Sequence, residues 1–173
     1  MHVIILAGGR GTRLAEETES RPKPLVEIGG HPMLWHIMNI YADHGFNDFL
    51  VACGYKGGMI KDYFRGHFYD ESDYFVDLSS GAIDVVNPSR VDWRVGVIDT
   101  GLDTQTGGRL GRLAPYIGGE RFMVTYGDGV GDIDITKLLE FHESHGGLAT
   151  VTAVRPPARF GGLALDGSTV RRF

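Results

Sequence analysis

Short apolar runs alternate along this chain with stretches of helical period, and the two patterns predict its elements in order. Apolar runs bounded by glycine or charged residues predict β-strands over His2–Ala7, Asp48–Cys53, Arg94–Thr100, Phe122–Tyr126 and Leu148–Val154. Apolar residues three and four apart predict helices over Pro32–His44, Met59–Phe64, Gly108–Tyr116 and Ile135–His145. Strands that alternate with helices are typical of an α/β fold, here a doubly wound, mostly parallel sheet with helices on both faces.

Two parts of the chain depart from this regular alternation of strands and helices. Residues 74–86 favour an antiparallel excursion from the parallel sheet. Near the end of the chain, Gly162–Leu165 and Val170–Phe173 resemble strands that expect partners. We therefore expect further sheet structure outside the core alternation of strands and helices.

Size and charge limit the class of protein. With 173 residues, 42% hydrophobic and 23% charged, the chain can bury a core in one compact domain over residues 1–173. A net charge of −5 argues against nucleic acid or an anionic membrane as partner, although locally concentrated cations still attract an anionic substrate. No long apolar run predicts a membrane span, so a cytoplasmic protein is expected. The single cysteine, Cys53, is expected to be packed and unreactive.

The first predicted strand runs into a glycine-rich loop that carries positive charge. Gly8, Gly9 and Gly11 let the backbone approach phosphate oxygens, and Arg10 and Arg13 add charged donors. A Walker A loop would end in Gly-Lys-Ser/Thr, and a dinucleotide fingerprint would need a further glycine, so neither matches. A triphosphate cradle is the leading interpretation, with a structural strand-to-helix turn as the alternative.

A second cationic segment, Arg21-Pro22-Lys23-Pro24, follows this loop. Its prolines stiffen the backbone that carries Lys23. The loop and this segment are therefore two fixed positive elements that could converge on one polyphosphate.

Two more predicted strands end in residues suited to a nucleotide, and ligands of doubly wound sheets bind outside the carboxyl ends of the strands. After the third strand, Thr104 and Arg109 lie in a stretch of threonine and glycine that leaves room for a base or ribose. An ordinary helix cap is the alternative there. Gly127 and Asp128 follow the predicted strand Phe122–Tyr126, and the carboxylate of Asp128 suits Mg²⁺. A plain Asp-Gly turn without a ligand is the alternative there.

Together these motifs resemble those of a known enzyme family. The run Leu6-Ala7-Gly8-Gly9-x-Gly11-Thr12-Arg13-Leu14, followed by Arg21-Pro22-Lys23-Pro24-Leu25, is similar to the signature of sugar-phosphate nucleotidylyltransferases. Further segments narrow the resemblance to the members that transfer cytidylyl groups to glucose 1-phosphate, and they cover nearly the whole chain. These segments are Glu16-Glu17-Thr18, Val26-Glu27-Ile28-Gly29-Gly30, Leu34-Trp35-His36-Ile37-Met38, Cys53-Gly54-Tyr55-Lys56-Gly57, Asp99-Thr100-Gly101, Thr106-Gly107-Gly108-Arg109-Leu110 and Thr125-Tyr126-Gly127-Asp128-Gly129-Val130.

The resemblance implies a Rossmann-like nucleotidyltransferase fold and transfer of CMP from CTP to glucose 1-phosphate, with Mg²⁺ as cofactor. It implies catalytic roles for Arg13, on the departing pyrophosphate, and for Lys23, on the α-phosphate and the attacking phosphate. Residues implied in binding nucleotide or substrate are Leu6, Ala7, Gly8, Gly9, Arg10, Gly11, Thr12, Arg13, Lys23, Thr104, Arg109 and Gly127, and the implied metal ligand is Asp128. The family's CDP-glucose generally leads to dideoxysugars of surface polysaccharides such as O-antigen, and relatives form homo-oligomers.

The resemblance covers only the N-terminal part of such enzymes. Relatives continue beyond the position of Phe173 with a Glu-Lys-Pro segment and a long C-terminal half, so we expect part of the sugar site and a second metal aspartate to be missing here. Two alternatives stay open at this point. One is a uridylyl- or thymidylyltransferase, since the phosphate loop does not read the base, and the other is a non-catalytic nucleotide-binding module.

Overall fold

The structure is a computed structural model that describes residues 1–9, 20–88, 91–154, 164–166 and 169–172. The chain divides into two units, Met1–Asp132 and Ile133–Phe173. One domain over residues 1–173 stays a prediction.

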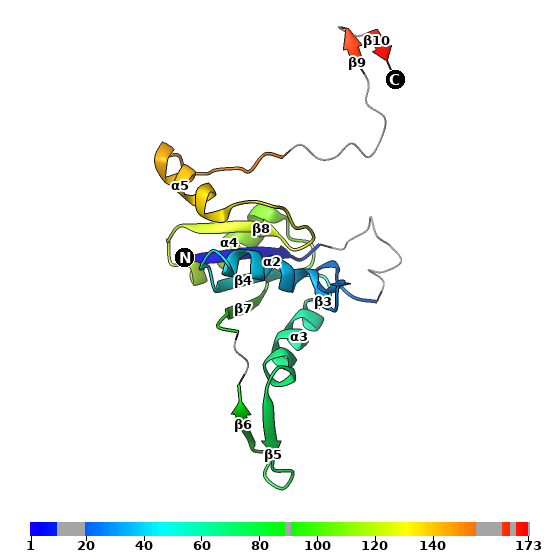
Figure 1. Ribbon diagram of the computed structural model, residues 1–173, viewed down its shortest axis with the longest axis vertical. Helices are drawn as coiled ribbons and strands as arrows, with labels where there is room; N and C mark the ends of the chain where they lie inside the picture. Colours follow the sequence, from blue (N-terminus) through cyan, green and yellow to red (C-terminus); the bar gives the residue numbers. More distant parts are fainter. Residues whose placement is uncertain (10–19, 89–90, 155–163, 167–168, 173) are drawn as a thin grey trace. The chain divides into compact units, whose positions relative to one another are not determined.

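A four-stranded sheet lies at the centre of the first unit (Figure 1). Its strands are β1 (His2–Ala7), β4 (Asp48–Cys53), β7 (Arg94–Asp99) and β8 (Phe122–Tyr126), in the order β7-β4-β1-β8 and all parallel. The two inner strands are almost wholly buried, which explains why their sequences are continuous apolar runs. The α/β fold class and the four strands are confirmed, with the third ending one residue before Thr100.

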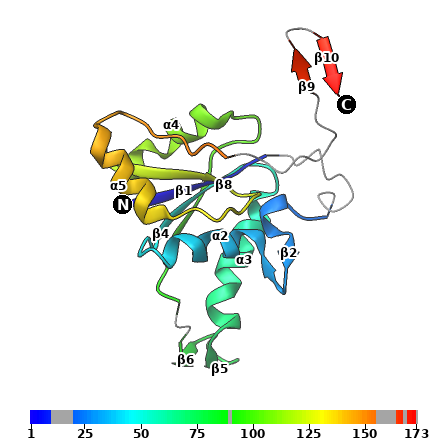
Figure 2. The same cartoon turned by 45° about the horizontal axis from the view of Figure 1, so that its top comes forward.

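Helices cover both faces of this sheet (Figure 2). On one face α4 (Thr106–Ile117) packs over a buried cluster. The buried members of that cluster are Ile4, Leu50, Ala52, Leu113 and Ile117. On the other face lies α2 (Met33–Ala42), whose Tyr41 hydroxyl hydrogen-bonds Thr125 of β8. Thr125 pairs with Ile5, which points away from the α4 side because neighbouring strand residues alternate between faces.

Between β1 and α2 the chain forms a 3₁₀ helix and a short hairpin. The 3₁₀ helix η1 (Lys23–Leu25) buries Leu25, and the hairpin consists of β2 (Glu27–Ile28) and β3 (His31–Pro32). The amide of Met33 donates to the carbonyl of Val26 across the base of this hairpin, at 2.8 Å. The proline-flanked Lys23 therefore sits in a short, hydrogen-bonded segment.

The excursion predicted over residues 74–86 is confirmed. It is an antiparallel hairpin of β5 (Asp73–Val76) and β6 (Ile83–Asn87) that follows α3 (Gly57–Asp70) (Figure 1). α3 is longer than the predicted Met59–Phe64 at both ends, and its second half carries the stacked rings of Tyr63 and His67, a pair four residues apart that supports a helix.

In the second unit, α5 (Ile135–His145) has the predicted bounds, and the Asp134 side chain caps it by accepting from the Lys137 amide at 3.0 Å. β9 (Ala164–Asp166) and β10 (Thr169–Arg172) form an antiparallel pair. The strand predicted over Leu148–Val154 is wrong. A strand needs a neighbour for its backbone hydrogen bonds, and described residues provide none there. None of the described helices has the length and apolar character needed to cross a bilayer.

The strand order creates a switch point between β1 and β8. From β1 the chain proceeds outward through β4 to β7, and then returns to place β8 on the opposite side of β1. In open α/β sheets the crevice outside the carboxyl ends of two such strands is where ligands bind. The segments after β1 and β8 are therefore the first places to look for a functional site.

Candidate functional site

A cavity of about 340 Å³ opens at the carboxyl end of the sheet. Its walls come from the ends of β1 and β8, the segment after β7 and the start of α4. The lining residues are Leu6, Gly8, Gly9, Leu102, Asp103, Thr104, Gln105, Thr106, Arg109 and Tyr126. Five of the residues that the sequence points to, Leu6, Gly8, Gly9, Thr104 and Arg109, are among them. The structure thus brings the loop after β1 and the loop after β7 to one place.

The first part of the glycine-rich loop is held tightly. Ala7 is 2% exposed, and the Gly8 carbonyl accepts hydrogen bonds from the Tyr55 amide at 3.3 Å and from Arg109 Nη2 at 3.0 Å. The rest of the predicted cradle, Arg10, Gly11, Thr12 and Arg13, lies outside the described residues.

Lys23 and Asp128 meet although 105 positions separate them. Lys23 Nζ lies 2.6 Å from Asp128 Oδ2, and their side chains are 27% and 45% exposed. The partners reach this point from η1 and from the turn after β8. The predicted phosphate-binding lysine and the predicted metal ligand therefore lie side by side at the switch point.

Gly127 joins the two sides of this switch point. Its amide donates to the Leu6 carbonyl at 3.0 Å, which extends the β1–β8 pairing by one step. A Cβ at this position would lie 3.1 Å from the Leu6 oxygen and 3.2 Å from Pro24 Cγ, so a side chain would press on both. Close packing therefore explains why a glycine occupies this position. The predicted contact of Gly127 with the nucleotide stays a prediction.

Arg109 is buried, at 6% exposure. Its Nη1 donates to the Cys53 carbonyl, the Thr100 hydroxyl and the Gly101 carbonyl, and its Nη2 to the carbonyls of Gly8 and Leu102. Burial lowers the pKa of this guanidinium below its ordinary value. These donors face protein oxygens, and the predicted contact of Arg109 with a nucleoside stays a prediction.

The predicted Mg²⁺ site would rest on Asp128. Among the residues that the structure describes, no three His, Cys, Asp or Glu side chains are grouped to hold a metal ion. A single carboxylate still fits Mg²⁺, which often takes only one or two protein ligands beside substrate phosphates and water. Asp128 can supply one such carboxylate, and in this structure its charge is paired with that of Lys23.

Several residues of the cavity lack a role in the sequence-based assignment. Asp103 and Gln105 flank Thr104 in the segment after β7, and Tyr126 ends β8. The signal that could have identified them is their place in the sequence: Asp103 and Gln105 lie in the segment after a predicted strand, and Tyr126 is the last residue of another. The buried Thr100, at 0% exposure, carried the same signal, because it is the last residue of the predicted strand Arg94–Thr100.

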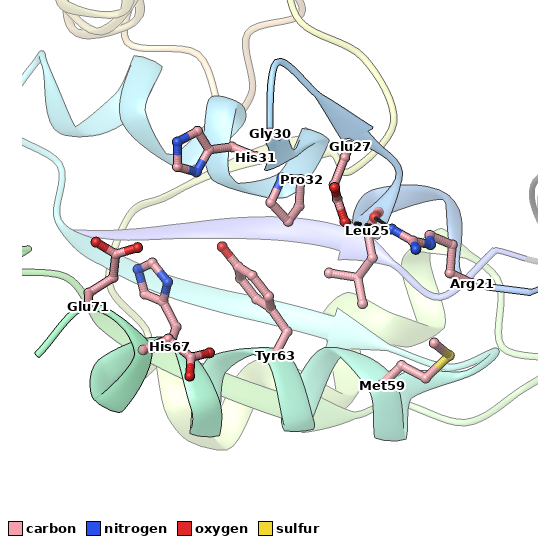
Figure 3. Close-up of a pocket in the computed structure, with 11 residues that line it drawn as sticks. Arg21, Leu25, Glu27, Gly30, His31, Pro32, Met59, Tyr63, His67 and Glu71 are labelled. Carbon is pink, nitrogen blue, oxygen red and sulfur yellow. Dashed lines mark hydrogen bonds and ion pairs between the residues drawn. The ribbon is translucent and has the colours of Figure 1, made fainter.

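A second cavity, of about 380 Å³, lies between η1, the β2–β3 hairpin and α3 (Figure 3). It is lined by Leu25, Tyr63 and His67, among others, and by none of the predicted site residues. Arg21 also lines it and forms an ion pair with Glu27 at 2.7 Å. One cation of the Arg21-Pro22-Lys23-Pro24 segment therefore faces a carboxylate beside this second cavity, while Lys23 reaches the switch point.

Known proteins resemble the chain over its whole length. The nucleotidyl transferase family model matches residues 2–173. A glucose-1-phosphate cytidylyltransferase of Salmonella typhi is 49% identical over 174 residues, which cover 100% of this chain and 68% of that protein.

Solved structures agree with this similarity. HddC from Yersinia pseudotuberculosis is 27% identical with a TM-score of 0.58, and the match covers 82% of this chain and 53% of HddC. The same protein in complex with GMP-PN gives 30% identity and a TM-score of 0.53. With the glycine-rich loop, the Lys23–Asp128 pair and the cavity at one edge of a parallel sheet, these matches identify the chain as a member of the nucleotidyl transferase family of enzymes.

Proposed function

We propose that this protein transfers CMP from CTP to glucose 1-phosphate, in the presence of Mg²⁺, giving CDP-glucose and pyrophosphate. In this reaction a phosphate oxygen of glucose 1-phosphate attacks the α-phosphorus of CTP and forms a new P–O bond. The bond from the α-phosphorus to the bridging oxygen breaks, and its electrons leave with pyrophosphate. No protein nucleophile takes part, so the enzyme acts by positioning and by neutralising charge.

The observation that carries this proposal is the Lys23–Asp128 pair at the β1–β8 switch point. A cation and a metal-binding carboxylate within one ion-pair distance suit a phosphate that is held by the lysine on one side and by Mg²⁺ on the other. When bound, Mg²⁺ would neutralise phosphate charge and orient the phosphate oxygens.

The remaining roles are those that the family resemblance implies. Amides of Gly8, Gly9 and Gly11, with Thr12, would cradle the phosphates, and Arg13 would hold the departing pyrophosphate. Lys23 would contact the α-phosphate and the attacking phosphate. Thr104, Arg109 and Gly127 would lie near the nucleoside. The cavity wall that contains Thr104 and Arg109 supports this last assignment for those two residues.

The choice of base and sugar rests on relatives. The Salmonella typhi protein is named for glucose 1-phosphate and a cytidylyl group, whereas HddC was solved with GMP-PN. We propose CTP because the first of these is the more similar. A role in making nucleotide sugars for surface polysaccharides, a cytoplasmic location and a homo-oligomeric state belong to the same proposal.

Pyrophosphate release tests the function. The chain is incubated with Mg²⁺, glucose 1-phosphate and, in separate reactions, CTP, UTP, dTTP or GTP. Release that needs all components and is fastest with CTP supports the proposal. Fastest release with another nucleotide overturns the choice of CTP, and nucleotide binding without product indicates a non-catalytic module.

Lys23→Ala tests the assigned mechanism. Loss of one preorganised charged contact should lower turnover about a hundredfold. Lys61→Ala is the matched control, because Lys61 is an exposed lysine on α3 that lines neither cavity, and its turnover should stay within about twofold of wild type. Equal turnover for the two variants would remove Lys23 from the mechanism.

A further inference from the structure

A buried polar cluster joins the carboxyl ends of three adjacent strands. The Arg109 guanidinium donates to the carbonyl of Gly8 after β1 at 3.0 Å, of Cys53 at the end of β4 at 2.9 Å, and of Gly101 after β7 at 2.8 Å. Each of these carbonyls belongs to a different strand end, and one rigid, planar group satisfies all three. The position of the guanidinium therefore sets the relative positions of the three loops.

Thr100 holds the guanidinium in place. Its hydroxyl donates to the Cys53 carbonyl at 2.6 Å and accepts from Arg109 Nη1 at 2.7 Å. A hydroxyl has one proton, so donation to Cys53 turns a lone pair of the oxygen toward Arg109. The Thr100 carbonyl accepts from Arg112 Nη1 at 2.6 Å, which anchors Thr100 itself to α4.

Two glycines leave room for the guanidinium. A Cβ on Gly8 would overlap Arg109 Cζ, and a Cβ on Gly54 would lie 2.7 Å from Nη1 and 2.9 Å from Nη2. Real Cβ atoms do not approach other atoms so closely, because hard-sphere repulsion excludes it. The guanidinium therefore occupies a slot between two backbone segments.

The bond from Arg109 to the Gly8 carbonyl also orients the next amide. None of the described peptide bonds is cis, and in a planar trans peptide the C=O and the following N–H point in opposite directions. With the Gly8 oxygen turned toward Arg109, the Gly9 N–H points away from the guanidinium. Gly9 lines the cavity, and a phosphate cradle needs such N–H groups aimed at the anion.

We propose that Thr100 is a positioning residue of the nucleotide site: through Arg109 it orients the Gly8–Gly9 peptide, so that the Gly9 N–H is available to a phosphate. The ligand is the triphosphate of the nucleotide, so this proposal rests on the proposed function. It gives Gly8 a role in accommodating Arg109, in addition to its predicted approach to phosphate.

Two substitutions at Thr100 separate the hydroxyl from the packing of the side chain. Thr100→Val keeps the shape and removes the hydroxyl, and Thr100→Ser keeps the hydroxyl. We expect Thr100→Val to raise the Kd for CTP with Mg²⁺, measured by calorimetry, about tenfold, a loss typical of one charge-assisted hydrogen bond. Thr100→Ser should stay within about threefold of wild type. Equal Kd values for the two variants would overturn the proposal.

A core variant excludes general destabilisation as the cause. Leu34→Ala removes a fully buried side chain of α2, on the face of the sheet opposite α4. It should lower the melting temperature at least as much as Thr100→Val while the Kd for CTP, measured well below melting, changes less than about twofold. If Leu34→Ala raises the Kd for CTP as much as Thr100→Val does, lost stability is enough to explain the weaker binding. That result would overturn the positioning role of Thr100.

Amide hydrogen exchange tests the orientation without any nucleotide. Peptides covering residues 4–9 should exchange at least about tenfold faster in Thr100→Val than in Thr100→Ser if the hydroxyl restrains the Gly8–Gly9 peptide. Equal exchange in the two variants would overturn the proposal. If the wild-type chain binds no nucleotide, the proposed function fails, and the exchange rates by themselves still decide whether Thr100 restrains this peptide.

Discussion

Gly54→Ala would place a methyl group in the slot that the Arg109 guanidinium occupies. The new Cβ would lie 2.7 Å and 2.9 Å from the two terminal nitrogens of Arg109 and 2.9 Å from the Gly101 oxygen. The Gly101 oxygen belongs to the backbone and cannot easily move away from the new methyl group. The guanidinium must therefore move, although 6% exposure of Arg109 leaves little space for it.

The expected cost follows from the hydrogen bonds that this shift breaks. Hydrogen bonds to a charged group are each worth about 1.5–3 kcal/mol, and Nη1, the atom nearest to the new methyl group, donates to the carbonyls of Cys53 and Gly101. Loss of both, after partial relaxation and a gain of about 0.5 kcal/mol from a less flexible unfolded chain, gives a net destabilisation of about 3 kcal/mol. For a chain of this size that lowers the melting temperature by about 10 °C.

Urea unfolding followed by circular dichroism measures this free energy directly. Gly111→Ala is the matched control, since Gly111 lies on α4 and a Cβ added there would meet nothing within 4 Å. Alanine in a helix should stabilise by about 0.5–1 kcal/mol. A loss below about 0.5 kcal/mol for Gly54→Ala would refute the reasoning, because the slot would then be wide enough for a side chain.

Two further predictions concern single groups. Asp128→Asn removes the partner of Lys23 and should raise the Mg²⁺ concentration for half-maximal turnover about tenfold; an unchanged titration would exclude Asp128 as a ligand. Burial, with smaller contributions from the charges of Glu71 and Glu27, raises the pKa of Tyr63 to about 12. Since an unfolded tyrosine loses its proton near pH 10, the folded state should lose stability as pH rises from about 10 to 12. Tyr63→Phe should lessen that loss in urea unfolding, and an identical pH profile would contradict the raised pKa.

Three strands have the bounds that the sequence pattern predicts: two are almost wholly buried, and the third, Phe122–Tyr126, is half exposed. His2–Ala7 and Asp48–Cys53 form continuous apolar runs with the predicted bounds, because a central parallel strand must be apolar throughout. Leu148–Val154 is also apolar in part, yet it is not a strand, and Leu148 and Val151 are exposed. An apolar run becomes a strand only where a partner strand takes up its hydrogen bonds, and a partner is a property of the whole fold.

By itself, the sequence determined the glycine-rich turn after β1, the proline-flanked Lys23 and the carboxylate after β8, because backbone freedom, backbone stiffness and charge are properties of a few adjacent residues. Only the tertiary structure decided that Lys23 pairs with Asp128 and that the donors of Arg109 face Gly8, Cys53 and Gly101. These contacts join segments far apart in the chain, and the strand order that brings them together depends on long-range packing. Composition can supply a charged side chain, but burial and neighbouring carbonyls decide what it binds.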